Sequence, residues 1–170
     1  ARTVGITSLS RPHHGGDIRD TSSRKEDQRK EAALDQHRNP TRGKCAGMHT
    51  KALSNPRDLS LAYSPGVAYA CVAIAADPAM AFEYTSRGNL VAVITNGTAV
   101  LGLGNIGPLA SKPVMEGKGC LFKKFAGIDV FAIEIAEHDA YKLVVASALL
   151  EPTVTGPNLQ ELQATESCIS

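Results

Sequence analysis

The chain has little of what several protein classes need. It contains no tryptophan, and aromatic residues make up only 5% of its 170 residues. Nucleic-acid-binding surfaces combine a dense basic stripe with aromatic side chains for stacking, so this composition predicts no nucleic-acid partner. The longest uninterrupted apolar run is Val67–Ala76, about half of the roughly 20 residues that a bilayer span requires. The sequence therefore predicts no membrane segment.

Closely spaced cysteines are also missing. The four cysteines are Cys45, Cys71, Cys120 and Cys168, and none belongs to a C-x-x-C pair. This spacing predicts neither a structural zinc site nor a redox dithiol. Cys71 and Cys120 lie in apolar sequence and are predicted to be buried free thiols. Because free thiols suit a reducing compartment, we expect a cytoplasmic protein.

Charge divides the chain more than its net value of +1 indicates. Residues 1–44 carry ten Lys/Arg against six Asp/Glu, whereas residues 45–170 carry eight against eleven. Residues 1–30 are polar and show no hydrophobic period, which predicts a disordered basic head. A short helix is expected at about Glu26–His37. Residues 31–170 are long enough for one domain with its own core.

Strand and helix patterns alternate through the rest of the chain. Continuous apolar runs predict strands at Leu90–Thr95 and Ile128–Ile135. Helical patterns are expected at Val67–Ala76, from Asp77-Pro78, at Leu109–Phe125 with an interruption at Pro113 and the Gly117/Gly119 pair, and at Glu137–Leu150. This order predicts the α/β class, with a parallel-containing sheet flanked by helices. Such sheets carry their functional loops at the carboxyl ends of the strands.

A glycine pattern follows the first strand. Gly102-x-Gly104-x-x-Gly107, with Asp129 further along, matches the dinucleotide-binding fingerprint in its letters. However, Pro108 follows the last glycine, and Asp129 would precede its strand instead of ending it. A tight turn that packs a helix on a strand is the alternative, and we favour it.

Two side chains could exchange protons with a substrate. Tyr63 lies in a Ser-Pro-Gly turn region, and Lys118 stands between Gly117 and Gly119, where missing side chains allow close approach. A phenol and an amine both have ordinary pKa values near 10, and an amine whose pKa is lowered acts as a general base. The alternative is a surface lysine and a half-buried tyrosine.

Oxygen-bearing side chains gather near the end of the chain. Asn158, Gln160, Glu161 and Glu166 could offer ligands to a divalent ion. A solvated helix start is the alternative.

Six motifs together resemble one family, the N-terminal domain of bacterial-type malic enzymes. The resemblance covers about Ala33 to Glu166. The motifs are Arg57–Val67 (RDLSLAYSPGV), Tyr84–Ile94 (YTSRGNLVAVI), Asn96–Gly107 (NGTAVLGLGNIG), Lys112–Gly119 (KPVMEGKG), Leu121–Phe131 (LFKKFAGIDVF) and Leu150–Thr153 (LEPT).

The resemblance implies oxidative decarboxylation of L-malate to pyruvate and carbon dioxide, with hydride transfer to NAD or NADP. Lys118 matches the family's general base, which takes the proton of the malate hydroxyl, and Tyr63 matches the general acid that protonates the enolpyruvate carbon. Mg²⁺ or Mn²⁺ would act as a Lewis acid on the hydroxyl and keto oxygens. The resemblance also implies a homodimer formed through the N-terminal segments.

Two departures from the family pattern leave two hypotheses open. Where the family reads Asn-Leu-Glu-Asp and binds its metal, this chain has Gln160 and Glu161, which should weaken a Mg²⁺ site. The family's third metal-binding Asp and its dinucleotide-binding domain would lie beyond Ser170. The chain is therefore expected to be the substrate half of a malic enzyme, inactive by itself, or else a non-catalytic relic or interaction module with the same fold.

Overall fold

The computed structural model describes residues 18–162, with side chains from residue 22. It divides into two units, with the boundary after Arg42, and each unit is described by itself. The predictions for residues 1–17, Glu166 and Cys168 lie outside the described residues.

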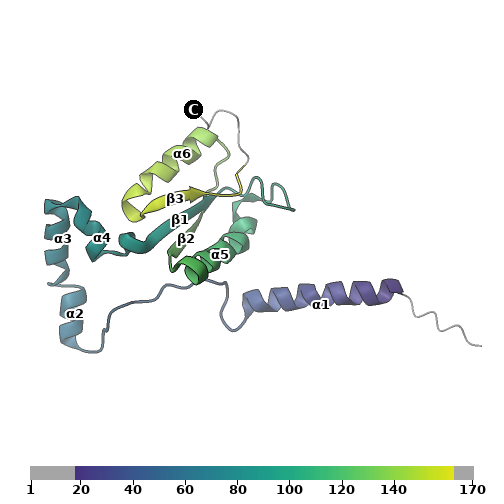
Figure 1. Cartoon of the computed structure of the whole chain (residues 1–170), viewed down its shortest axis with the longest axis horizontal. Coiled ribbons are helices and arrows are strands. Elements are labelled where there is room, and N and C mark those ends of the chain that lie inside the picture. Colours follow the sequence, from purple (N-terminus) through teal and green to yellow (C-terminus); the bar gives the residue numbers. More distant parts are fainter. Residues whose placement is uncertain (1–17, 163–170) are drawn as a thin grey trace, which may run out of the picture. The chain divides into compact units, whose positions relative to one another are not determined.

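The first unit consists of one long helix, α1 (Ile18–Arg38) (Figure 1). The helix differs from the prediction of a disordered head to residue 30, because it already begins at Ile18. Its sequence is rich in Arg, Lys, Glu, Gln and Ala and contains neither Gly nor Pro, so the backbone conformation is favourable even without a buried face. The Asn39 side chain donates to Asp35 Oδ1 at 2.8 Å, and Pro40 follows.

The second unit alternates short helices, strands and a single longer helix. The elements are α2 (Pro56–Ala62), α3 (Val67–Ala76), the 3₁₀ turn η1 (Pro78–Met80), α4 (Ala81–Tyr84), the 3₁₀ turn η2 (Ser86–Asn89), β1 (Leu90–Thr95), α5 (Gly107–Ala126), β2 (Asp129–Glu134), α6 (Ala140–Leu149), the 3₁₀ turn η3 (Glu151–Thr153) and β3 (Gly156–Leu159). The predicted start at Asp77-Pro78 is confirmed, since the Asp77 side chain accepts from Ala79 N–H.

The three strands form a parallel sheet in the order β2-β1-β3. The α/β class and both predicted strands are confirmed. The third strand, β3, was not predicted, because its sequence Gly-Pro-Asn-Leu has few of the residues that favour strands. It occupies an edge of the sheet, where Pro157 is tolerated because one side of the strand needs no partner.

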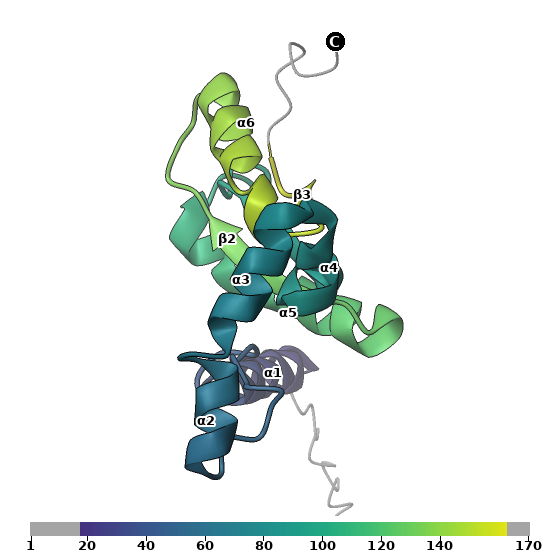
Figure 2. The ribbon, with the colours of Figure 1, turned by 90° about the vertical axis from the view of Figure 1, so that its left-hand side faces the viewer.

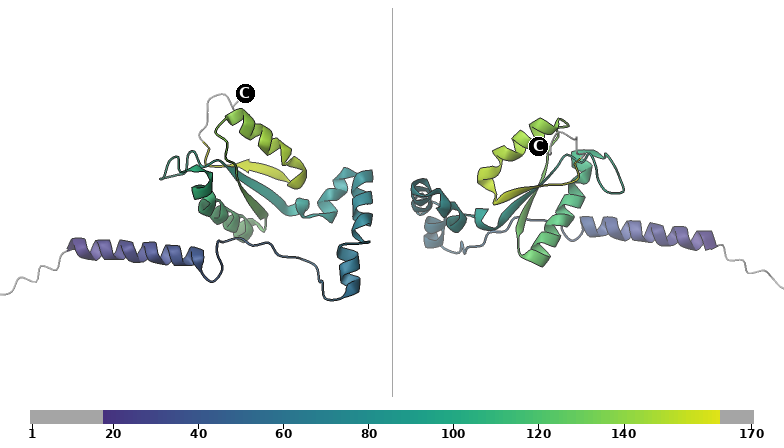
Figure 3. Two further views of the ribbon diagram at one scale, coloured as in Figure 1. Left: turned by 180° about the vertical axis from the view of Figure 1, so that it is seen from behind. Right: turned by 45° about the horizontal axis from the view of Figure 1, so that its top comes forward.

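The core lies on the two faces of β1. On one face, Leu90, Ala92 and Ile94 cluster with Val154, and Leu150 packs against them. The helices α5 and α6 cover opposite faces of the sheet (Figures 1 and 3). Apolar side chains on both faces are what a central parallel strand requires, and this explains the continuous apolar run.

The helix α5 differs from its prediction, because it runs unbroken through the expected interruption. Pro113, Gly117 and Gly119 all lie inside it. A Cβ at Gly119 would lie 3.5 Å from the side chain of Val130, an ordinary van der Waals distance, so α5 packs directly against β2 at this position. The packing outweighs the low helix propensity of glycine. Gly127 ends the helix with φ +72°, a conformation that glycine adopts readily.

The helices α2 and α3 follow one another as two separate short helices (Figures 1 and 2). Neither contains a buried residue, although the sequence of α3 is apolar throughout. Cys71 on α3 is consequently exposed, so its predicted burial is wrong. Together Pro56–Ala76 is long and apolar enough to cross a membrane by length and composition alone, which differs from the prediction of no such segment. A soluble core helix or a signal sequence meets the same test, and here a turn separates the two helices.

Candidate active site

The carboxyl end of β1 continues into a loop that hydrogen bonds fix in place. Thr95 and Asn96 are buried. The backbone N–H of Gly97 donates to Thr95 Oγ1 at 2.9 Å. The Asn96 side chain accepts from Thr98 Oγ1 at 2.7 Å and donates to the carbonyl of Glu137 at 3.0 Å. The loop is therefore held both by its own strand and by the segment after β2.

The glycine pattern forms a tight turn at the tip of this loop. Gly102, Gly104 and Gly107 have φ values of +77°, +70° and +79°, which glycine adopts without steric cost. The N–H of Gly104 donates to Val100 O at 2.8 Å, and that of Gly107 returns to Gly97 O at 3.1 Å. The helix α5 then begins at Gly107, as the tight-turn interpretation expects.

Asp129 also agrees with the tight turn. It begins β2 and forms an ion pair with Lys123 at 2.8 Å. An acidic residue that binds a nucleotide ribose follows its strand, whereas Asp129 lies at the opposite end of β2.

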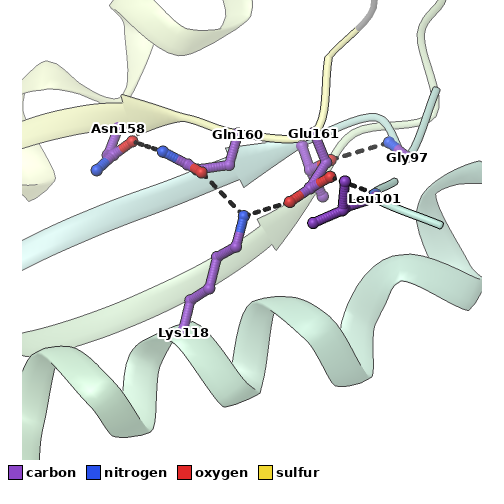
Figure 4. A network of polar contacts seen from close by, with 7 residues as sticks. Gly97, Leu101, Lys118, Asn158, Gln160 and Glu161 are labelled. Carbon is purple, nitrogen blue, oxygen red and sulfur yellow. Dashed lines mark hydrogen bonds and ion pairs between the residues drawn. The ribbon is translucent and has the colours of Figure 1, made fainter. Parts of the chain in front are cut away.

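Lys118 on α5 reaches the segment that follows β3. Its Nζ donates to Gln160 Oε1 at 2.9 Å and to Glu161 Oε1 at 2.6 Å (Figure 4). The Lys118 and Glu161 side chains are 25% and 14% exposed, so the pair is largely shielded from solvent. The structure thus brings together three of the four predicted site residues.

The backbone around Glu161 is pinned to the end of the sheet. Gln160 N–H donates to Ile94 O at 2.9 Å, and the Glu161 carbonyl accepts from Ala99 N–H at 3.2 Å. The other carboxylate oxygen of Glu161 accepts from Leu101 N–H at 3.0 Å. Glu161 has φ +54°, the one positive value for a non-glycine residue in the described part of the chain. Such a conformation costs free energy and is concentrated at functional sites.

The electrostatics of Glu161 follow from these contacts. The hydrogen bond from Lys118 lowers the pKa of the Glu161 carboxyl below its ordinary 4.5, and Leu101 N–H and the Lys118 charge act in the same direction. Partial burial opposes them. The ionised carboxylate is therefore favoured, and it faces the Lys118 ammonium directly.

Tyr63, the fourth predicted site residue, lies elsewhere. It follows the last residue of α2, and it is 70% exposed. Among the described residues, no hydrogen bond links its hydroxyl to Lys118. One chain therefore does not assemble the tyrosine and the lysine into a single site.

The described residues do not form a divalent-cation site. Gln160 and Glu161 supply one carboxylate and one neutral amide, and Lys118 hydrogen-bonds to both. The other Glu161 oxygen is bonded to Leu101 N–H. Over residues 18–162 no three His, Cys, Asp or Glu side chains gather in a way that could hold a metal. Because a hard dication needs several free oxygen ligands, this donor set does not fit Mg²⁺ or Mn²⁺ as it stands.

A second ion pair at the carboxyl end of the sheet was not predicted. Lys112 Nζ lies 2.8 Å from Glu134 Oε2 at the end of β2. This hydrogen bond raises the pKa of Lys112 above its ordinary value. The other Glu134 oxygen is buried with no partner among the described residues. Only the position of Glu134 at the end of an apolar strand could have pointed to it.

Comparison with known proteins agrees with this architecture. The family "Malic enzyme, N-terminal domain" matches residues 42–150. The chain belongs to this family. Among relatives, the NADP-dependent malic enzyme of Haemophilus influenzae is 63% identical over 140 residues, which are 82% of this chain and 18% of that protein. The NAD-dependent malic enzyme of Rhizobium meliloti is 60% identical over 134 residues, 79% of this chain and 17% of that protein.

A solved malic enzyme shares the fold. The crystal structure of the malic enzyme from Pyrococcus horikoshii superposes with a TM-score of 0.78 at 47% identity, covering 81% of this chain and 32% of that one. The chain spans about a fifth of the length of the two curated relatives named above. The relatives are named for different cofactors, NADP in one case and NAD in the other.

Proposed function

We propose that this chain is the substrate-binding part of an NAD(P)-dependent malic enzyme, in which Lys118 takes the proton from the malate hydroxyl. The observation that supports the proposal is the position of Lys118 Nζ. It lies at the carboxyl end of the parallel sheet, beside Gln160 and Glu161, where open α/β sheets bind their ligands.

In the chain by itself the Lys118–Glu161 pair joins an ammonium to a carboxylate, so Lys118 must first release a proton before it can act as a base. A neutral amine at Lys118 would accept the hydroxyl proton at Nζ, and the carboxylate 2.6 Å away would stabilise the resulting ammonium. Glu161 itself is fixed by Leu101 N–H, so the partner does not need to be ordered during the reaction. Tyr63 is exposed and apart from Lys118 in one chain, so it would donate its phenolic proton to the enolpyruvate carbon only in an assembly that brings the two residues together, such as the dimer proposed below.

The cofactor would be NAD or NADP, which accepts the hydride from the malate carbon. Relatives named for each cofactor support this statement at the level of the family. Mg²⁺ or Mn²⁺ is implied by the resemblance alone. Gln160 and Glu161 do not fit a cation site as they stand, so the proton transfers proposed here use only side chains of the chain itself.

We further propose a homodimer formed through α2 and α3. Their large apolar side chains are exposed, with Leu61 at 65%, Tyr69 at 78% and Val72 at 69%. Several large apolar side chains exposed on two successive helices favour a partner that covers them. A second copy presents the same surface, which is the requirement of a twofold interface.

We also propose a cytoplasmic location. The described cysteines are free thiols, which suit a reducing compartment.

One observation favours the alternative of a non-catalytic interaction module. The oxygens that would face a metal are bonded to Lys118 and Leu101 instead, and Gln160 carries no charge. A domain that had lost its metal chemistry while keeping its fold would show this arrangement.

A fusion experiment separates the two functions. The chain is joined in frame to the part of the Haemophilus influenzae enzyme that follows the matched region, and malate-dependent NADP reduction is measured. We expect saturable turnover from the fusion and none from the isolated chain, because a hydride acceptor must be held beside the substrate. A folded fusion that binds NADP but leaves malate unchanged would favour the interaction module. Turnover by the isolated chain would contradict the proposal that this chain supplies only the substrate-binding part of the enzyme.

A further inference from the structure

Two cysteines that are far apart in the sequence meet on one face of α5. The segment from Gly43 to Cys45 lies along this helix, where the N–H of Lys44 donates to Glu116 Oε2 at 2.9 Å. The Cys45 thiol donates to the carbonyl of Glu116 at 3.7 Å. Cys120, one helical turn after Glu116, donates to the carbonyl of Lys44 at 3.5 Å.

These contacts place the two sulfur atoms on the same side of the helix. Residues 116 and 120 are four apart and share a helix face. Gly119 lies between them in sequence, and a Cβ there would be 3.5 Å from Cys45 Sγ. The sulfur of Cys45 therefore lies in van der Waals range of position 119, next to Cys120 in the sequence. The Lys44 carbonyl that accepts from Cys120 belongs to the peptide group of Cys45 itself.

We propose that Cys45 and Cys120 are an oxidisable pair that forms a reversible intramolecular disulfide. The prediction from spacing, that the chain contains no redox dithiol, considered neighbours in sequence only. The fold brings together two cysteines that the spacing separates.

The reaction balances with a peroxide as the oxidant. One thiolate attacks a peroxide oxygen, the O–O bond breaks, and a sulfenic acid and one water form. The second thiol attacks the sulfenic sulfur, the S–S bond forms, and the hydroxyl leaves as a second water. The two sulfurs lose two electrons in total, and the two peroxide oxygens gain them. A small thiol reduces the bond again by exchange.

The environment sets the conditions for oxidation. Cys45 as a whole residue is exposed, but the atoms packed around its sulfur desolvate the thiol and raise its pKa above its ordinary 9.0, and the neighbouring Cys120 thiol adds to this effect. Because the thiolate is the reactive form, oxidation through Cys45 should accelerate by about tenfold per pH unit from neutral pH upwards. The pair would then respond to strong or sustained oxidation instead of brief exposure.

The disulfide would fix the Gly43–Cys45 segment on α5 at Cys120, which is two residues after Lys118 in the sequence. It would also close a long loop in the unfolded chain, which reduces the entropy of that state. The oxidised chain should therefore melt about 5–10 °C higher than the reduced chain.

Peptide mapping of the full 170-residue chain tests the proposal. The chain is treated with hydrogen peroxide, blocked with iodoacetamide and cleaved with trypsin, which cuts after Lys44, Lys51, Lys118 and Lys123. We expect a linked pair of peptides, 45–51 joined to 119–123, from protein that migrates as a single chain in denaturing electrophoresis without reductant. Dithiothreitol should separate the two peptides and reverse the melting shift.

Matched variants identify the sulfurs. Cys45→Ser and Cys120→Ser should each abolish the linked peptide and the melting shift, whereas Cys71→Ser, which changes an exposed cysteine, should retain both. Mapping the unsubstituted chain keeps the test decisive even if a variant folds poorly. The proposal would be overturned if peroxide produced only links through Cys71 or Cys168, or oxidised single cysteines without a 45–120 bond. The test reads a covalent bond and does not depend on the proposed activity.

Discussion

Lys118 Nζ lies 2.6 Å from Glu161 Oε1, although the two residues belong to α5 and to the segment after β3. This ion pair joins the helix to the end of the sheet, and both side chains are mostly shielded from solvent. An ion pair in such a position has consequences for stability as well as for chemistry.

Glu161 should make the fold sensitive to acid. Its pKa is lowered in the folded state, so its stabilising contribution is present above its ordinary 4.5 and is lost as the pH falls through the folded value. Glu161→Gln should lower the free energy of unfolding by about 1–3 kcal/mol at pH 7 and by less at pH 3. Urea denaturation at the two pH values measures the difference.

The control for this prediction is Asp129→Asn. Asp129 pairs with Lys123 at a similar distance, but both side chains are more than half exposed. Solvent screens such a pair, and we expect a loss below about 1 kcal/mol at pH 7. Equal losses in the two variants would show that the shielded Lys118–Glu161 pair stabilises the fold no more than the exposed Lys123–Asp129 pair does.

Gly97 should be far less tolerant of a side chain than Gly102. Both have positive φ, but a Cβ at Gly97 would lie 2.1 Å from the carbonyl oxygen of Gly107, whereas nothing lies within 4 Å at Gly102. Gly102→Ala should cost about 1–2 kcal/mol from backbone strain alone. Gly97→Ala adds a backbone clash and should cost more than about 3 kcal/mol. Thermal melts of the two variants compare the costs, and similar values would contradict the loop geometry.

Divalent-ion binding should be weak in this chain. Restoring the family pair with Gln160→Glu and Glu161→Asp adds one negative charge and shortens one side chain, so Mn²⁺ affinity should rise by about tenfold or more. Titration calorimetry with Mn²⁺ on both forms measures the gain. Tight binding by the unsubstituted chain, or no gain from the double change, would show that these positions are not the metal site.

The proposed dimer depends on the exposed surface of α3. Val72→Glu places a charge on that surface and should weaken association by about 100-fold, the equivalent of roughly 3 kcal/mol. Leu149→Glu on α6, where the side chain is 76% exposed, is the matched control and should leave association unchanged. Sedimentation over a range of concentrations gives both constants. A monomer at all concentrations, or a dimer that ignores Val72→Glu, would contradict the interface.

The sequence predicted those parts of the fold that depend on local patterns. The apolar run at Leu90–Thr95 gave β1 with its observed bounds, because a central parallel strand is apolar on both faces. In contrast, Gly156–Leu159 has no such pattern and becomes a strand only because β1 offers it an edge. The helix α5 was predicted to break at its glycines, since the benefit of packing Gly119 against Val130 is tertiary.

In the candidate site, too, residue types could be predicted from the sequence, whereas contacts that depend on packing could not. Lys118, Gln160 and Glu161 were first candidates by residue type and position, the family resemblance then assigned their expected roles, and the fold brings them together. The ion pair between Lys118 and Glu161, and the proximity of Cys45 and Cys120 to one another, could not be read from spacing, because both depend on how α5 packs. The position of Tyr63 apart from Lys118 is likewise a property of the folded chain.

The central claim is that Lys118 is the base, and its most direct measurement is kcat for malate oxidation by the fusion protein carrying Lys118→Met. Lys123→Met, which changes an exposed lysine on the same helix, is the control. We predict that kcat falls by about 10²- to 10⁴-fold in the Lys118 variant and stays within about twofold of the parent in the control, with both proteins folded by circular dichroism. A Lys118→Met fusion that keeps more than about a tenth of the parent kcat would contradict the account, because removing a general base costs about 10²-fold or more.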